Sequence, residues 1–194
     1  MVSTFIGRDQ TLPTEDNLEL VKQLWPDIIR LAETLNVRIA IENCPMLFRT
    51  RSVAGRSESY DDSGSVEKRF LRSWTATVWV LITTRRNFVW QMIDPIRPIY
   101  EFKDKIFHVH YKDIKLYPER LNDCGIMAYP LDFMSPKIPG LGDVDWGRYV
   151  SALTDIGYNG YSCIEIEDKA FESSREMIEK ALVLSQRYLR QYVI

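Results

Sequence analysis

Acidic and histidine side chains follow or end three short apolar segments of this chain. Glu42 comes directly after residues 37–41, His108 and His110 lie in residues 106–111, and Glu165 lies in residues 160–166. An unpaired charge in an apolar strand is costly, whereas carboxylates and imidazoles together bind divalent ions well. If the three segments converge, their polar residues predict a metal centre. A solvated or salt-bridged surface position is the alternative interpretation for each residue taken alone.

The three segments are expected to be β-strands that alternate with helices. Alternation of this kind predicts parallel βα units, in which active sites lie at the C-terminal ends of the strands. The period of a strand places His108 and His110 on one side, and Glu165 and Glu167 on one side. The pattern fits an open sheet as well as a barrel.

The sequence predicts the following elements in chain order. The first half has a strand at 2–6, a helix at 15–35 capped by Thr14 and a strand at 37–41. After the segment 49–86 come a helix at 88–106 interrupted by Pro95 and Pro98, a strand at 106–111 and a long Pro/Gly-rich loop. The chain ends with a helix at 146–156 capped by Asp145, a strand at 160–166 and a last helix from Ser173 or Ser174.

The bulk composition limits the function classes. The chain has 194 residues, 45% of them hydrophobic, and a net charge of -2, which suits one domain but is short of the roughly 250 residues of a complete (β/α)8 barrel. A pI near 5.8 makes nucleic acid an unfavoured partner. No signal peptide or membrane-spanning run is visible, and three isolated cysteines favour a reduced, cytoplasmic chain.

Five motifs in chain order resemble sugar phosphate isomerases/epimerases of the xylose-isomerase-like TIM barrel superfamily. The resemblance covers residues 1–48 and 87–194. It implies that the strands are among the fourth to eighth of a (β/α)8 TIM barrel. The expected fold class is therefore α/β, a partial and N-terminally truncated barrel in a single domain over 1–194. The motifs are 5–8 (FIGR), 41–46 (IENCPM), 108–113 (HVHYKD), 139–146 (PGLGDVDW) and 164–168 (IEIED).

The resemblance also implies a metal site. The family holds its ion with a Glu, an Asp, a His and a Glu from strands five to eight. Glu42, His110 and Glu165 match three of these ligands. The family's Asp lies in an Asp-Pro-Ser-His motif, where this chain has Thr84-Arg85-Arg86-Asn87. The implied cofactor is a divalent metal ion (Mn, Mg, Co or Zn).

Further roles follow from the same resemblance. Glu42 and Glu165 would exchange a proton at a sugar carbon as general base and acid. The expected substrate-binding residues are His108, which could instead orient His110, Lys112, which could offset a phosphate or carboxylate, and Asn43. Glu167 and Asp168 would support the ligands or cap the next helix.

The implied function is metal-dependent isomerisation or epimerisation of a small sugar or sugar phosphate, with no nucleic acid or membrane partner. Assembly into a homo-oligomer is left open. Two alternatives to this function remain open. A metal-dependent phosphodiesterase of the AP-endonuclease type shares the barrel, but it needs more His and Asp ligands than two histidines allow. A catalytically inactive barrel fragment is the other.

Residues 49–86 interrupt the resemblance, and we interpret them as a segment read out of frame. Residues 58–68 can be encoded so that a start one base later reads Asn-Leu-Met-Thr-Thr-Pro-Ala-Val-Trp-Arg, which resembles the family's sequence after strand five. Residues 80–86, with the preceding base and a shifted start, can read Gly-Leu-Asn-Tyr-Asp-Pro-Ser, the family's strand six. A divergent surface loop is the alternative. Resequencing the gene tests this hypothesis, because an unambiguous read with no base differences removes sequencing error.

Overall fold

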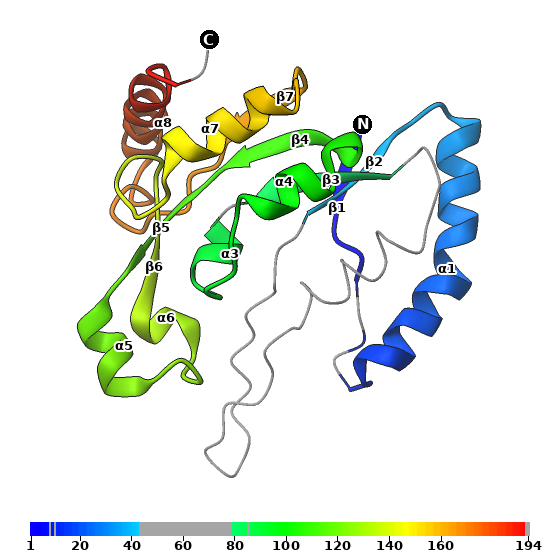
Figure 1. Cartoon of the computed structure of the whole chain (residues 1–194), viewed down its shortest axis with the longest axis horizontal. Helices are drawn as coiled ribbons and strands as arrows, with labels where there is room; N and C mark the ends of the chain where they lie inside the picture. The colour runs from blue at the N-terminus through cyan, green and yellow to red at the C-terminus, as the bar shows by residue number, and fades with distance from the viewer. Residues whose placement is uncertain (8, 10, 43–78, 85, 193–194) are drawn as a thin grey trace. The chain divides into compact units, whose positions relative to one another are not determined.

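A computed structural model describes residues 1–7, 9, 11–42, 79–84 and 86–192. The chain divides into two compact units, residues 1–82 and 83–194, and each is described by itself (Figure 1). Most of the segment predicted to be disturbed, 49–86, lies outside the described residues, as does Asn43. Among the described helices, none is long and apolar enough to cross a membrane.

The first unit is a parallel βα arrangement. Strands β1 (Val2–Thr4), β2 (Ile39–Glu42) and β3 (Trp79–Thr84, which runs on past the unit's last residue) lie in that order. Val2 is opposite Ile39 in the first pair, and Glu42 is opposite Ile82 in the second. All four residues of β2 are buried, as the apolar run at 37–41 predicts.

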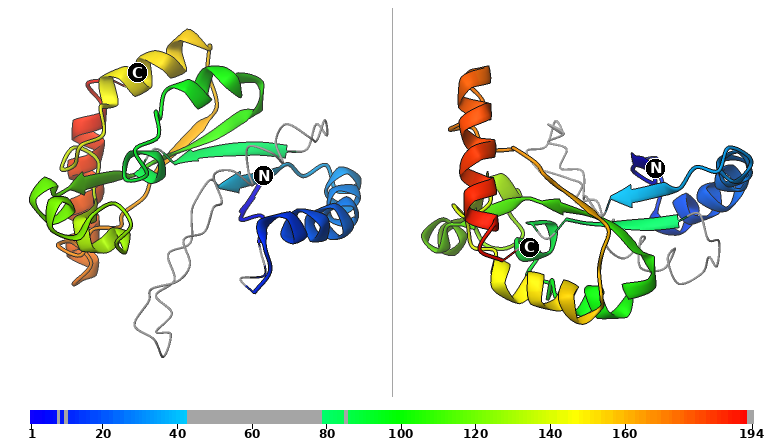
Figure 2. Two further views of the ribbon diagram at one scale, coloured as in Figure 1. Left: turned by 60° about the horizontal axis from the view of Figure 1, so that its bottom comes forward. Right: turned by 90° about the horizontal axis from the view of Figure 1, so that it is seen from above.

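Helix α1 (Thr14–Thr34) packs on β2, and both views in Figure 2 show it beside that strand. Its buried residues recur at helical spacing and form one cluster with the strand. Pro26 stays inside the helix, although it removes one backbone donor. The predicted and observed helices agree within one residue at each end. The cluster comprises Val21, Trp25, Ile29, Ala32, Ile39 and Ile41.

The start of α1 differs from the sequence prediction. Thr14 was expected to cap the helix, but the capping position is Pro13, which makes no side-chain cap. Asn17, which is only 3% exposed, instead holds the start of the helix by hydrogen bonds to the preceding loop. Its Nδ2 donates to the carbonyls of Asp9, Leu12 and Pro13, and its Oδ1 accepts from the Asp9 amide at 2.7 Å. The buried amide therefore fixes the entry of the chain into the helix.

The second unit contains β4 (Ile106–Tyr111) and β7 (Tyr161–Ile164), which pair in parallel. Helices α7 (Trp146–Asp155) and α8 (Arg175–Leu189) precede and follow β7 in the chain, and α8 contacts β7. The predicted caps are confirmed, because Asp145 accepts from the Arg148 amide and Ser174 from the Met177 amide. These are the hydrogen bonds expected of helix N-caps.

The predicted helix at 88–106 is wrong. The structure has instead α3 (Arg86–Val89), α4 (Arg97–Glu101) and the 3-10 turn η1 (Lys103–Lys105). The two prolines explain the break, since each lacks an amide donor and restricts the residue before it. Pro98 is tolerated because it lies in the first turn of α4.

The predicted long loop after β4 also contains regular structure. Strands β5 (Asp113–Leu116) and β6 (Met134–Lys137) form an antiparallel pair. Helices α5 (Pro118–Cys124) and α6 (Pro130–Phe133) lie between them. Both short helices begin with a proline, which suits the first helical position but reads as a loop signal in the sequence.

Asp113 ties the next loop to this hairpin. Its side chain is fully buried. Oδ1 accepts from the amides of Ile114 and Val144 at 2.8 and 3.1 Å, and Oδ2 accepts from the Gly140 amide and from Trp146 Nε1, each at 2.9 Å. One carboxylate thereby holds residues 138–146 against the start of β5, so that the loop following the hairpin has a fixed path.

Candidate functional site

Three potential metal ligands lie together on β4 and β7. His110 is opposite Cys163 in the parallel pair, so the two side chains share a face, and alternation puts His108 on that face as well. One ligand atom from each of the three lies within 4.8 Å of the others. The two imidazole rings meet edge to face, with centroids 5.1 Å apart. The structure thus confirms that both histidines of the chain point the same way.

Glu165 follows β7 directly and turns toward the histidines. Its Oε2 lies 3.0 Å from Nδ1 of His110, and its Oε1 lies 2.6 Å from Nζ of Lys112. The Lys112 side chain is 3% exposed, and its Nζ also lies 3.4 Å from Glu167 Oε1. Lys112 is therefore an internal counter-ion between two carboxylates, and its charge is already matched inside the protein.

The electrostatics of this cluster keep Glu165 ionised. Burial acts to raise the pKa of Glu165, but His110 and Lys112 together outweigh burial and lower it to about 2. The pKa of His108 is lowered, first by burial and then by the neighbouring His110. Metal binding requires neutral imidazoles and ionised carboxylates, and the lowered pKa values of His108 and Glu165 favour those two states.

Among the other predicted site residues, the structure describes Glu42 and Asp168 but not Asn43. Glu42 ends β2 in the first unit, where it is 6% exposed. Asn43 lies outside the described residues. Asp168 is 1% exposed, and its Oδ1 accepts from Lys137 Nζ and the Ala170 amide, each at 3.1 Å. Ser174 caps α8.

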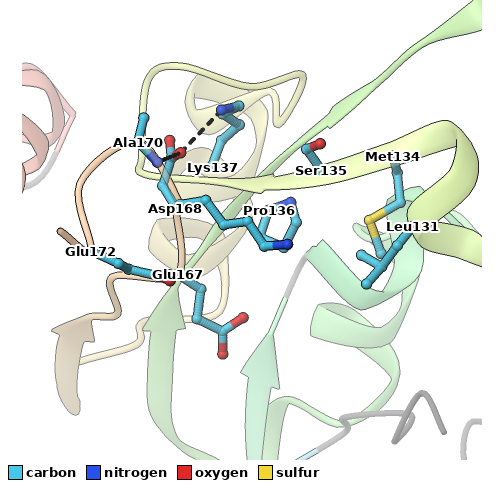
Figure 3. Close-up of a pocket in the computed structure, with 10 residues that line it drawn as sticks. Leu131, Met134, Ser135, Pro136, Lys137, Glu167, Asp168, Ala170 and Glu172 are labelled. Atoms are coloured by element: carbon cyan, nitrogen blue, oxygen red, sulfur yellow. Dashed lines mark hydrogen bonds and ion pairs between the residues drawn. The ribbon is translucent and has the colours of Figure 1, made fainter. Parts of the chain in front are cut away.

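A cavity of about 310 Å³ lies between β6 and the segment that follows β7. Figure 3 shows its two ends. The Lys137 ammonium and the Asp168 carboxylate face each other at one end, and Leu131 and Met134 lie at the other, with Ser135 between them. Glu167 also lines this cavity. Glu167 contacts Lys112, which in turn contacts Glu165. Lys112 and Glu167 therefore connect the His110–Glu165 pair to the cavity.

The residues present fit a divalent cation. His108 Nδ1 is buried and has no hydrogen-bond partner among the described residues, and leaving such an atom unpaired costs free energy. His110 shares one group of potential ligands with His108 and Cys163 and also contacts the ionised Glu165, so the nitrogen, sulfur and oxygen donors near His110 form a mixed set. That set suits Mn²⁺, Co²⁺ or Zn²⁺ better than Mg²⁺, which prefers oxygen ligands.

Sequence reasoning missed two residues of this region. A lone cysteine gives no ligand signal by itself, so Cys163 emerges only from the strand register that places it opposite His110. Lys137 lay in what was predicted to be a loop, and its pairing with Asp168 depends on the β5–β6 hairpin.

Comparisons with known proteins concern the family and the fold of this chain. The family model described as Xylose isomerase-like TIM barrel matches residues 1–192. Among solved structures, a xylose isomerase domain protein from Planctomyces limnophilus has a TM-score of 0.66 at 16% identity, over 98% of this chain and 60% of that one. The IOLI protein, solved with a zinc atom, has a TM-score of 0.64 at 17% identity, over 96% and 61%.

A D-psicose 3-epimerase from Clostridium cellulolyticum H10, solved with D-tagatose, has a TM-score of 0.62 at 14% identity, over 95% of this chain and 60% of that one. No curated protein sequence matches this chain significantly. The chain therefore spans about 60% of the length of the solved structures that it resembles. The predicted fold class, a partial α/β TIM barrel, is confirmed.

Proposed function

The chain belongs to the xylose isomerase-like TIM barrel family, and from that premise we propose that it is a metal-dependent sugar isomerase or epimerase. The 3.0 Å contact between His110 and Glu165, at the C-terminal ends of parallel β4 and β7, carries the proposal. In parallel α/β folds this is the end where active sites lie. The solved relatives with epimerase names support the reaction class.

His110 and Glu165 would hold the divalent ion in this proposal. When bound, the ion would supply polarisation of the carbonyl and hydroxyl oxygens of a sugar. His108 packs edge-on against His110, which suits it to orient the ligand imidazole. Glu42, in the first unit, remains the third ligand predicted from the sequence.

Proton transfer at a carbon next to the sugar carbonyl is assigned to carboxylates. Glu165 is ionised and could accept the proton from carbon as general base. Glu42 is the second carboxylate that the sequence predicts for this exchange. Lys112 holds Glu165 through its 2.6 Å contact, so it acts here as a positioning residue for that carboxylate.

Metal binding by the purified chain tests the proposal. We expect isothermal titration of the metal-free chain with Mn²⁺, Co²⁺ and Zn²⁺ to show one site that is lost in His110→Ala and weakened in Glu165→Gln. Glu119→Gln, an exposed carboxylate on α5, is the matched control and should bind as the wild type does. No binding of any of these ions by the wild-type chain would contradict the proposal.

The metal-loaded chain can then be assayed against ketoses and inositol derivatives. Interconversion of at least one pair, lost in Glu165→Gln, is the expected result. A chain that binds metal but converts none of them would leave the catalytically inactive fragment as the correct reading.

A further inference from the structure

Two histidines and a cysteine of the second unit form a set of nitrogen and sulfur ligands that contains no carboxylate. This thiol set (His108, His110 and Cys163) lies on the paired strands β4 and β7. One ligand atom from each residue lies within 4.8 Å of the other two. The strand register therefore brings three metal-binding side chains together without any residue of the first unit.

The separations within the thiol set suit a tetrahedral ion after a small adjustment. Zinc binds imidazole nitrogen at about 2.0–2.1 Å and thiolate sulfur at about 2.3 Å, which places tetrahedral ligand atoms roughly 3.3–3.6 Å apart. Starting from separations of no more than 4.8 Å, each pair of atoms has to close by at most about 1.5 Å. Rotation of the side chains on fixed strands supplies a movement of that size. Three protein ligands leave the fourth position of the ion open.

The atoms of this set are available to an ion. Cys163 is a half-buried free thiol. His108 has a buried ring nitrogen, Nδ1, that has no hydrogen-bond partner among the described residues. Glu165, in contrast, contacts Lys112 at 2.6 Å, and an ion bound through His108 and Cys163 leaves that ion pair unchanged.

The sulfur ligand decides which ion fits the thiol set. Thiolate is a soft ligand that favours Zn²⁺, whereas carboxylate suits Mn²⁺ and Mg²⁺. His110 also has Glu165 as a neighbour, 3.0 Å from its Nδ1. A neutral imidazole offers one nitrogen to a metal, because the other nitrogen carries a proton. His110 can therefore bind an ion with the thiol set or an ion with Glu165, but not both at once.

We propose that His108, His110 and Cys163 form a second metal site, which binds Zn²⁺. This thiol site is an alternative to the site of His110 and Glu165, which binds Mn²⁺, and the two compete for the shared imidazole. His108 is a ligand in the thiol site, in addition to its contact with His110. The competition rests on the proposed function, which places an ion on His110 and Glu165, whereas the thiol site itself stands without it.

Alkylation of the full wild-type chain tests the sulfur ligand without any substitution. We expect saturating Zn²⁺ to slow the reaction of Cys163 with iodoacetamide at least about tenfold, because the ion occupies the thiolate that would attack the reagent. Mn²⁺ should leave the rate unchanged. The exposed Cys124 is the internal reference and should react equally with either ion. Peptide mass spectrometry assigns the modified cysteines.

Cobalt is a spectroscopic probe of the same ligands, because thiolate-bound Co²⁺ has an intense near-ultraviolet charge-transfer band. We expect this band in the wild-type chain, its loss in Cys163→Ser, and its retention in the matched controls Cys44→Ser and Cys124→Ser. By calorimetry, Zn²⁺ affinity should fall at least about tenfold in Cys163→Ser and in His108→Ala. Mn²⁺ affinity should stay at the wild-type value in Cys163→Ser.

Three outcomes would overturn the inference: alkylation of Cys163 that Zn²⁺ does not slow, no cobalt band in the wild-type chain, or a band that persists in a folded Cys163→Ser chain. The alkylation result holds even if Cys163→Ser fails to fold. Mn²⁺ binding that is weakened in Glu165→Gln reports on the proposed function separately. Mn²⁺ binding without zinc protection of Cys163 would refute this inference alone, and the reverse result would refute the carboxylate site alone.

Discussion

Replacing Asp113 by asparagine should cost the second unit much of its stability. The side chain is fully buried and accepts four N–H groups, two on each oxygen. Asparagine has the same shape but only one acceptor oxygen. Whichever way the amide turns, two N–H donors that bonded a carboxylate oxygen would face an NH2 group instead.

The size of the effect follows from those two lost bonds. A hydrogen bond to a charged group contributes about 1.5–3 kcal/mol, so their loss costs roughly 3–6 kcal/mol. Burial raises the pKa of Asp113, while the hydrogen bonds from Trp146 and the three amides lower it. The charge itself is thus expensive to bury, and its removal offsets part of the loss. We expect a net loss of about 3 kcal/mol, out of a typical total of about 5–15 kcal/mol.

Urea unfolding, followed by tryptophan fluorescence, measures this loss because Trp146 donates directly to Asp113. Asp143→Asn is the matched control. Asp143 accepts one hydrogen bond, from the Leu116 amide at 2.7 Å, in an exposed position, and its replacement should cost no more than about 1 kcal/mol. If Asp113→Asn and Asp143→Asn unfold at the same urea concentration, the carboxylate does not hold the loop as described.

Further predictions concern the same unit. Gly142→Ala would place a Cβ against Asp113 Oδ1 and the Ile114 carbonyl oxygen; we expect a loss of at least about 2 kcal/mol in urea unfolding, and an unchanged midpoint would contradict the packing. Ser174→Ala removes the cap of α8 and should lower the unfolding free energy by about 1 kcal/mol, whereas no change would mean that the cap contributes nothing. Lys112→Met removes the cation that holds Glu165 at 2.6 Å, so Mn²⁺ affinity measured by calorimetry should fall about tenfold; equal or tighter binding would show that Lys112 does not position Glu165.

Local sequence signals predicted the strands and long helices well. The apolar run of β2, the spacing of Val21, Trp25 and Ile29 in α1, and the caps Asp145 and Ser174 are properties of a few neighbouring residues. Such signals can be recognised in the sequence without knowledge of the tertiary structure. The strand-end positions of His110 and Glu165 were predictable for the same reason.

Features that depend on distant residues were not predictable. Lys112 was expected to face a substrate group, and that role stays a prediction; its pairing with Glu165, 53 positions later in the numbering, was not predicted. The β5–β6 hairpin brings Lys137 to Asp168, and neither strand has a distinctive apolar period. Prolines at the starts of α5 and α6 gave loop signals where short helices form.

Anomalous diffraction from crystals of the full chain soaked in Mn²⁺ shows directly whether His110 and Glu165 bind a metal ion. We expect one strong peak within ligand distance of His110 and Glu165, and no such peak in crystals of His110→Ala. A peak bound elsewhere, or none in crystals of the wild-type chain at saturating Mn²⁺, would contradict the assignment of these two residues as metal ligands.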